Sequence, residues 1–269
     1  MKIYVYGIID SNKQVDEPVY GLEKARVYNI PFRDIGVVAS DLTGLMPDVT
    51  EDNILAHEDV VESLMENFTV LPVKFLTVFD AKENILSMMG DYYTDFKDNL
   101  NRLRNKVEFG IKVIWPAEKI KEHITSCYWK SGWKEAVSDD SPIKRFIREK
   151  FEKYKIDKEF TEKANRLVTT IDIFLGKSAA EKKLEKLKTE NLLLDGVYLV
   201  EKDKQSNFKE AFEHIRSART DLRYLFSGPW PPYNFVILPR KYCQLRDSGR
   251  ADISDKVIQH QGLVGADAI

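Results

Sequence analysis

The stretch KIYVYGII, residues 2–9, alternates tightly and is rich in Ile, Val and Tyr. β-branched and aromatic residues in this pattern are typical of a strand with at least one buried face. Two more short strands are predicted after a polar loop, at 25–30 and 33–40, because Pro31 interrupts the run between them. We expect these two to pair as a hairpin, so that the chain opens with three strands.

A helix is predicted after Thr50, which precedes two acidic residues as the N-cap of a helix does. The apolar positions that follow recur at helical spacing and are Ile54, His57, Val61, Leu64 and Phe68. The β-rich run 70–79 comes next, and Pro72 restricts it to a strand start, an edge or a bulge. We therefore expect a loop that leads into a strand.

Helical spacing returns from 85 to 103, with Gly90 inside the pattern. Glycine weakens or bends a helix, so one broken helix or two are expected. Residues 107–115 show clean period two, with Glu108 on the polar side, and this pattern predicts a strand. We expect this strand to close an amino-terminal α+β domain at residues 1–116.

Long charged helical segments follow Pro116 and begin with helical spacing at 117–127. Ser141 followed by proline predicts a second helix start, and Asp157 is expected to restart another helix. A third charged helical piece is expected around Leu184 and Leu187. We expect these helices to pack as a helical hairpin or short coiled coil, and their balanced Lys and Glu favour a solvated surface over a nucleic-acid arm.

The carboxyl-terminal domain is expected to end in a small β-α-β unit. Its predicted elements are a strand at 192–200, a helix at 208–218, a strand at 222–226 and a last strand at 233–238. From Pro239 the chain is polar and contains glycine, so we expect residues 240–269 to form a tail that is ordered only if something docks it. The predicted fold class is thus α+β, with domains at 1–116 and 117–239.

The composition is that of a soluble globular protein of about two domains. The 269 residues include 41 Lys and Arg against 43 Asp and Glu, a net charge of −2, which argues against a general nucleic-acid binder. No apolar run approaches the ~18 residues that cross a bilayer, so no membrane partner is expected. The amino terminus turns polar at Asp10, too early for a secretory signal, and the two cysteines form no CxxC pair. These features favour the cytoplasm and reduced thiols.

Motifs for chemistry are incomplete in this chain. His57-Glu58 begins like a zincin motif, but Val61 stands where the second histidine would be, which favours a hydrogen-bonded, partly buried histidine. Gly176-Lys177-Ser178 lacks the upstream glycine of a phosphate loop, and no GxGxxG or GxSxG motif occurs. We therefore predict no catalytic residue, no metal site and no cofactor.

The stretch GPWPPY, residues 228–233, is unusually stiff because three prolines restrict its backbone. We favour a rigid corner joining two strands, with Trp230 and Tyr233 packed inward. The alternative is a ridge on which these aromatic side chains anchor a partner.

Five stretches together resemble the GvpL/GvpF family of gas vesicle accessory proteins. They are YVYGI (4–8), HEDVVE (57–62), LPVKFLTVF (71–79), EFGIKV (108–113) and SGPWPPYNFV (227–236), in family order. The resemblance makes the following residues candidates for family-specific interactions: His57, Glu58, Pro72, Lys74, Phe75, Gly228, Pro229, Trp230, Pro231, Pro232 and Tyr233. The chain departs from the family pattern LPVRFGT at Lys74 and Leu76, and we expect that leucine cannot replace glycine where the backbone needs a positive φ or a very close approach.

The resemblance implies a non-enzymatic cytoplasmic protein that takes part in gas vesicle formation. It implies a first domain similar to a modified ferredoxin-like fold and a second domain with a helical hairpin. The expected partners are the very hydrophobic major shell protein and other accessory proteins, because a soluble protein that covers apolar subunit surface would reduce aggregation. The competing hypothesis is an enzyme or small-ligand sensor whose site comes from residues distant in sequence.

Overall fold

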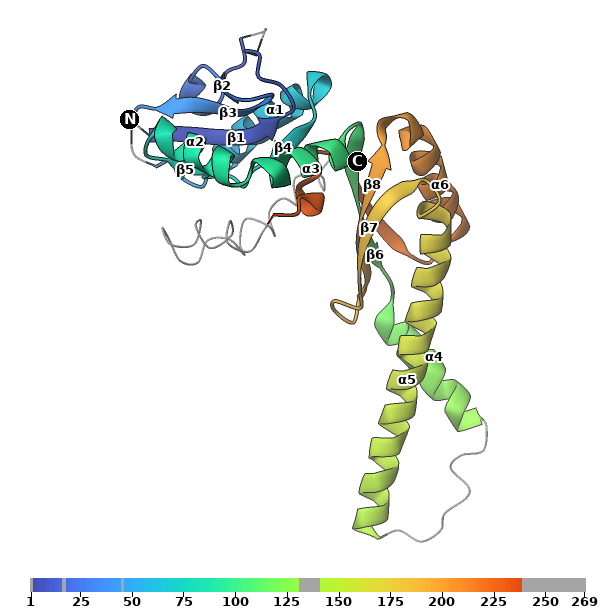
Figure 1. The fold of residues 1–269 in the computed structure, drawn as a ribbon. Helices are drawn as coiled ribbons and strands as arrows, with labels where there is room; N and C mark the ends of the chain where they lie inside the picture. Colours follow the sequence, from blue (N-terminus) through green and yellow to red (C-terminus); the bar gives the residue numbers. More distant parts are fainter. Residues whose placement is uncertain (1, 16–17, 45, 131–140, 239–269) are drawn as a thin grey trace. The chain divides into compact units, whose positions relative to one another are not determined.

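The computed structural model describes residues 2–15, 18–44, 46–130 and 141–238, which form nine β strands and six α helices (Figure 1). The strands are arranged in two sheets. Single 3₁₀ turns occur at Leu22–Lys24, Lys202–Lys204 and Tyr233–Phe235. The mixed class agrees with the predicted α+β fold, and the finer description of a modified ferredoxin-like sheet stays a prediction.

The chain divides into two compact units. Unit 1 comprises residues 1–108 together with 228–269, and unit 2 comprises residues 109–227. The division therefore runs through the strand predicted at 107–115, and residues 228–238 belong to the same unit as the amino terminus.

These units divide the chain at other positions than the boundary predicted at residue 116. That residues 1–116 and 117–239 fold as separate domains stays a prediction. The predicted tail at 240–269 lies outside the described residues.

Unit 1 contains a five-stranded sheet with the order β2-β3-β1-β4, and β5 also pairs with β1. Its strands are β1 (Lys2–Ile9), β2 (Tyr28–Phe32), β3 (Ile35–Leu42), β4 (Val70–Pro72) and β5 (Val78–Phe79). The opening strand and the pairing of the next two strands as a hairpin are as predicted, but β2 spans Tyr28–Phe32 instead of 25–30, so the prediction that Pro31 interrupts the run is wrong. Pro31 lies inside β2, opposite Gly36, because β2 is an edge strand, where sheets accept proline.

One face of helix α1 (Glu51–Asn67) packs with this sheet. The helix begins as predicted at Thr50, whose hydroxyl oxygen accepts a hydrogen bond from the Asn53 N–H at 3.3 Å. The shared buried cluster includes Tyr4, Tyr6, Val38, Ile54, Val61, Leu64 and Val70. The predicted apolar spacing is therefore the buried face of the helix.

The helical stretch after the sheet consists of two helices, α2 (Lys82–Asp91) and α3 (Tyr93–Leu103). The backbone leaves helical geometry at Tyr92, where φ is −117° and ψ is 16°. Gly90 lies within α2. The expected interruption is therefore present, although it falls after the glycine.

The second sheet has the strand order β7-β8-β6-β9. Its strands are β6 (Lys106–Ile114), β7 (Ala179–Lys186), β8 (Leu192–Glu201) and β9 (Arg223–Trp230). Two predictions are wrong here. Strand β6 does not close the first sheet but lies between β8 and β9, and the segment around Leu184 is the edge strand β7 instead of a helix.

The reason for the second error is the pairing of β7 with β8. Its residues from Ala179 to Lys186 form an antiparallel ladder with the buried strand β8, and Leu184 lies opposite Gly196. Ladder hydrogen bonds outweigh the helix propensity of Lys, Glu and Leu. Lysines on an edge strand also oppose pairing with other chains.

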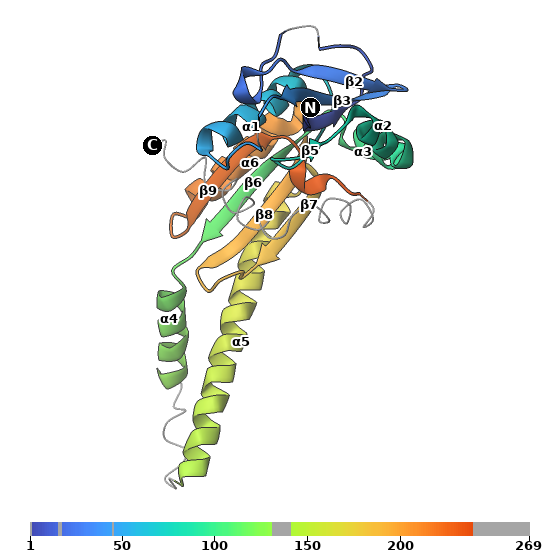
Figure 2. The same ribbon diagram turned by 90° about the vertical axis from the view of Figure 1, so that its left-hand side faces the viewer.

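Three helices complete unit 2: α4 (Ala117–Lys130), α5 (Pro142–Leu175) and α6 (Gln205–Ala218). Helix α5 is one continuous helix of 34 residues, so the predicted restart at Asp157 is wrong. Its start is as predicted, because the Ser141 side chain accepts a hydrogen bond from the Lys144 N–H at 3.3 Å. Helices α4 and α5 lie side by side (Figures 1 and 2), and the Trp115 and Phe160 rings near their contact are 4.7 Å apart.

Helix α6 lies between β8 and β9 in the chain, as the predicted β-α-β order requires. Its Phe208 and Phe212 rings stack on Phe109 and Phe226 of the second sheet at centroid distances of 5.1 and 4.4 Å. These aromatic contacts form much of the core of unit 2. Within the described ranges, none of the helices is both long and apolar enough to span a membrane.

Candidate functional site

His57 lies buried on the apolar face of α1, as the sequence predicted. Its Nε2 is 3.2 Å from the Val73 carbonyl oxygen, and its Nδ1 is 3.0 Å from the Tyr4 hydroxyl. A carbonyl can only accept, so Nε2 donates and Nδ1 accepts the Tyr4 proton. Burial lowers the pKa of His57 to about 4. The ring is therefore neutral near pH 7, with each nitrogen used by a protein group.

An aromatic cage surrounds this histidine. The Tyr6 ring stacks on the imidazole at 5.5 Å, and the Phe75 ring meets it edge-on at 5.9 Å. The Tyr6 hydroxyl accepts a hydrogen bond from the Leu22 N–H at 3.0 Å and lies 2.9 Å from the Ser40 hydroxyl. Burial raises the pKa of both Tyr4 and Tyr6, so both phenols stay protonated. The cage is a satisfied polar network inside a core.

Leu76 adopts the left-handed backbone conformation, with φ at 65°. Its N–H donates to the Tyr4 hydroxyl oxygen at 3.1 Å, and the adjoining Thr77 N–H and hydroxyl both donate to the Lys74 carbonyl. The expectation that leucine is excluded where glycine supplies a positive φ is therefore wrong in this chain. The hydrogen bonds to Tyr4 and Lys74 hold a conformation that costs an L-residue about 1–2 kcal/mol.

Residues 231–237, which we name the strap, bind to the rest of unit 1. Pro231 and Pro232 are buried, and Phe235 is one of the most buried large side chains of the chain. The Tyr233 hydroxyl donates to Glu58, with its oxygen 3.0 and 3.1 Å from the two carboxylate oxygens. Burial and the Glu58 charge raise the pKa of Tyr233. The strap thus combines an apolar anchor with a charge-assisted hydrogen bond.

Glu108 receives the next residue of the strap. Its two carboxylate oxygens accept from the Asn234 backbone N–H at 2.9 Å and from the Asn234 side-chain amide at 2.5 Å. The glutamate is buried, so the sequence expectation that Glu108 lies on the polar face of its strand is wrong. Two donors directed at one carboxylate offset the loss of water around it.

Asn99 and Arg102 of α3 hold the end of the strap. The Asn99 side chain donates to the Ile237 carbonyl at 2.6 Å and accepts from the Ile237 N–H at 2.8 Å. Arg102 donates to the Phe235 carbonyl. The Asn99 amide thus pairs with both the N–H and the C=O of one residue, as a neighbouring strand does in a β sheet.

Three site residues were not predicted from the sequence: Asn99, Arg102 and Glu108. A signal existed for Asn99, because it is a polar residue on the apolar stripe of a helix, adjacent to Leu100. Glu108 begins the family-like stretch EFGIKV, but its local sequence gives no indication of burial. Neither pattern identifies a partner more than one hundred residues away.

The candidate residues of the resemblance fall into two groups. His57 and Phe75 lie in the cage, and Glu58 binds the strap. Pro72 is buried in β4 opposite Gly7. Lys74 is exposed, and Trp230 is only half-buried at the end of β9. Gly228 has a φ of 108°, which glycine alone adopts readily, and Pro229 beside it is exposed. A role of these residues in binding a partner stays a prediction.

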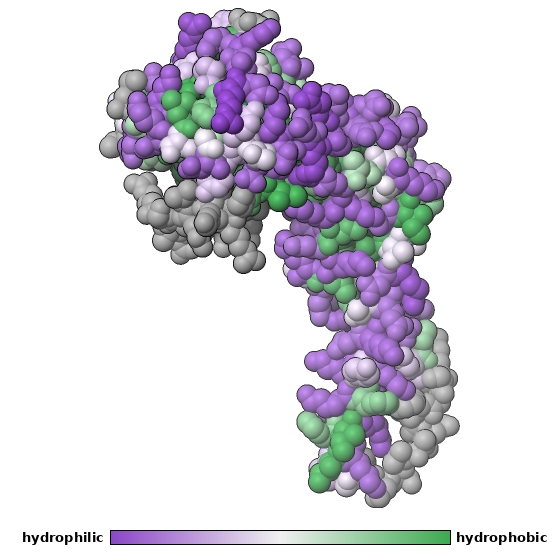
Figure 3. Space-filling view, viewed as in Figure 1, coloured by the Kyte–Doolittle hydropathy of each residue, from purple (hydrophilic) through white to green (hydrophobic). Residues whose placement is uncertain are grey.

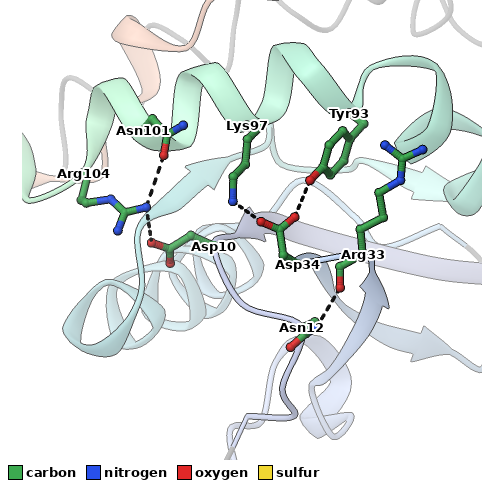
Figure 4. Close-up of polar contacts among 8 residues, drawn as sticks. All are labelled: Asp10, Asn12, Arg33, Asp34, Tyr93, Lys97, Asn101 and Arg104. Carbon is green, nitrogen blue, oxygen red and sulfur yellow. Dashed lines mark hydrogen bonds and ion pairs between the residues drawn. The ribbon is translucent and has the colours of Figure 1, made fainter.

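A second polar cluster joins the β2–β3 turn to α3 (Figure 4). Asp34 accepts from the Tyr93 hydroxyl at 2.5 Å and pairs with Lys97, and these two partners lower the pKa of Asp34 to about 2. The Arg33 guanidinium lies 4.4 Å from the centre of the Tyr93 ring. The cluster is exposed, and its charged groups are paired with one another. It therefore holds the β2–β3 turn against α3 and presents no group suited to catalysis.

Taken over the described part of the chain, no group of three or more His, Cys, Asp or Glu side chains could hold a metal ion. On helix α4, Cys127 Sγ and His123 Nε2 lie 3.7 Å apart, one helical turn from each other. The polar side chains of unit 1 described above therefore bind a segment that is distant in the chain.

The described residues thus define a two-sheet α+β protein whose carboxyl-terminal strap is bound by polar side chains of unit 1. The chain belongs to the family described as "Gas vesicle synthesis protein GvpL/GvpF", whose model matches residues 2–237. The match ends at Ile237, the last residue that we describe as bound in the strap. The resemblance inferred from the five stretches is confirmed.

Two named relatives illustrate the range of similarity. The chain is 25% identical to Gas vesicle protein F2 of Halobacterium salinarum over 252 residues, covering 92% of this chain and 98% of that protein. It is 23% identical to Gas vesicle protein L1 of the same organism, covering 87% and 89%.

Two solved structures share the fold. The crystal structure of GvpF from Anabaena sp. PCC7120 has a TM-score of 0.78 at 18% identity, and that of GvpF from Microcystis aeruginosa has 0.75 at 19%. Each similarity covers 88% of this chain and 99% of the other.

Proposed function

We propose that this protein takes part in gas vesicle formation as a non-enzymatic accessory protein that binds the hydrophobic major shell protein and other accessory proteins. The observation that carries the proposal is the family match over residues 2–237, which spans both compact units. Its place of action would be the cytoplasm, at growing gas vesicles.

The geometry of unit 1 supports a binding role over a chemical one. His57 uses both ring nitrogens inside the cage, and Glu58 and Glu108 bind the strap. These side chains thus bind other groups of unit 1 and stabilise its fold. No observation on the described residues favours the alternative of an enzyme or ligand sensor.

The test is co-purification from cells that make the other gas vesicle proteins one at a time. The full chain, carrying an affinity tag, should retain the major shell protein, whereas an unrelated protein with the same tag should not. Gas vesicles should also fail to form when the chain is deleted and return when it is supplied. Normal vesicles in the deletion strain, together with no retained shell protein, would overturn the proposal.

A further inference from the structure

The amino-terminal half of α5 exposes a row of large apolar side chains. The row, which we name the α5 stripe, consists of Ile143, Phe146, Ile147, Phe151 and Tyr154, with exposed fractions between 47% and 72%. Figure 3 shows hydrophobic side chains gathered near this end of the helix. Soluble proteins expose contiguous apolar patches mainly where something binds, so the α5 stripe requires an explanation.

The stripe continues a seam that is buried further along the same helix. After the buried Phe160, the buried positions Ala164, Val168, Ile171 and Leu175 alternate in steps of four and three. The same alternation, extended toward the start of the helix, reaches Ile143, Ile147 and Tyr154, with the polar residues Lys150, Asp157 and Thr161 at the positions between them. A repeat of this spacing follows a line along which another helix can pack lengthwise. One half of the seam packs inside unit 2, and the other half is exposed.

The exposed half is also the basic half. Residues 142–158 contain seven Lys and Arg against three Asp and Glu, a net charge of +4. Residues 159–175 contain two against three, a net charge of −1. Two lysines lean over rings of the stripe, Lys150 at 5.5 Å from the Phe146 centroid and Lys155 at 4.8 Å from the Phe151 centroid. An apolar row with basic flanks fits a surface that is apolar at its centre and acidic at its edges.

We propose that residues 142–158 bind an amphipathic helix of another protein, whose apolar face covers the α5 stripe and whose flanks carry Asp and Glu. A second copy of this chain fits less well, because two segments of charge +4 would face each other. A lipid surface fits less well, because Lys150 and Asp157 interrupt the apolar positions, whereas a helix that lies in a membrane interface has a broad, continuous apolar face. The inference goes beyond the proposed function, since it holds whichever protein supplies the helix.

The first experiment compares two synthetic helical peptides against the full chain. Both carry leucine at the seam positions, and they differ only in having Glu or Lys at the flanking positions. Fluorescence anisotropy should show the acidic peptide binding at least about tenfold more tightly than the basic one, with the difference shrinking at high salt. Equal binding of the two peptides, or binding of neither, would overturn the proposal.

The second experiment assigns the binding to the stripe. The double variant Phe146→Ser, Ile147→Ser should bind the acidic peptide about tenfold or more weakly. Its thermal unfolding should stay unchanged, because both side chains are exposed. Ile173→Ser is the matched control, since Ile173 is 56% exposed on the same helix but outside the stripe. An equal loss in the control would mean that the stripe is not the binding surface.

Two further outcomes would assign the surface to another occupant. If sedimentation shows a dimer for the unsubstituted chain but a monomer for the double variant, the occupant would be a second copy of the chain. Binding to phosphatidylserine vesicles without binding to the acidic peptide would point to lipid. Either result contradicts the proposal and leaves the shell-protein experiment unaffected, so the two proposals fail independently.

Discussion

Helix α1 and the amino-terminal half of α5 carry apolar rows of similar spacing with opposite outcomes. On α1 the row is buried against the sheet of unit 1, and even its histidine is neutral and enclosed. On α5 the row is exposed and flanked by basic residues. The contrast teaches that periodicity determines which face of a helix is apolar, whereas only the neighbouring elements determine whether that face stabilises the fold.

The strap sharpens this contrast. It covers unit 1 with a segment of the same chain, through Phe235 and through hydrogen bonds to Glu58, Asn99 and Glu108. The side chains of the α5 stripe, in contrast, keep exposed fractions between 47% and 72%. Substitutions in the first region should therefore change stability, and substitutions in the second should change binding.

The largest expected effect is at the apolar anchor of the strap. Phe235→Ala should lower the free energy of unfolding by about 3 to 5 kcal/mol, because a fully buried ring leaves a cavity. Phe146→Ala, on the α5 stripe, should change it by less than about 0.5 kcal/mol. Trp230→Ala should fall between them, since Trp230 is half-buried. Urea unfolding of the three variants measures the free energy of unfolding of each. Similar decreases at all three sites would contradict the difference in stability between the strap and the α5 stripe.

The next effect is a loss of stability in mild acid. His57 has a pKa lowered to about 4 in the folded chain against 6.5 for an ordinary histidine. Above pH 6.5 both states are neutral, and between about 6.5 and 4 only the unfolded chain takes up the proton. The free energy of unfolding should therefore fall by about 3 kcal/mol across this window as the pH decreases. Unfolding curves from pH 7 to 4 measure the loss.

The titration of the ring itself checks this prediction. Resonances of the His57 imidazole should stay unchanged down to about pH 5 and shift only near pH 4. Asp34→Asn should not change the pH range in which stability is lost, because the lowered pKa of Asp34 affects stability only at lower pH. A His57 ring that titrates near its ordinary pKa would show that the cage is open to water.

A smaller effect is expected at the carboxylate that binds the strap. Glu108→Gln should cost about 2 kcal/mol of unfolding free energy, because its amide group would face the donors of Asn234. Glu149→Gln on the exposed half of α5 is the matched control and should stay within about 0.5 kcal/mol. Equal stability of the two variants would mean that the strap is not held by Glu108.

The smallest expected effect concerns the backbone strain at Leu76, whose φ is positive. Leu76→Gly should be about 1 kcal/mol more stable than Leu76→Ala, because glycine adopts a φ of 65° without strain. Inside α1 the order should reverse, with Leu55→Gly about 1 kcal/mol less stable than Leu55→Ala. The same order at both positions would show that Leu76 is unstrained.

Several features of this protein follow from local sequence alone. Alternation in residues 2–9 is enough for the first strand, and Thr50 and Ser141 mark two helix starts through caps that use nearby N–H groups. The place of His57 on an apolar stripe likewise predicts a buried, hydrogen-bonded ring. In each case, the deciding interaction joins residues close in the chain or follows from one periodic face.

Tertiary structure alone decided where these elements go. Strand β6 reads as a strand from its period, but nothing local says that it joins β8 and β9. The segment around Leu184 favours a helix by propensity and becomes a strand through its ladder with β8. The strap meets Glu58, Asn99 and Glu108 across 175, 138 and 126 residues of chain. Periodicity carries no information about such partners, because burial of a polar group depends on which distant donor the folded chain brings to it.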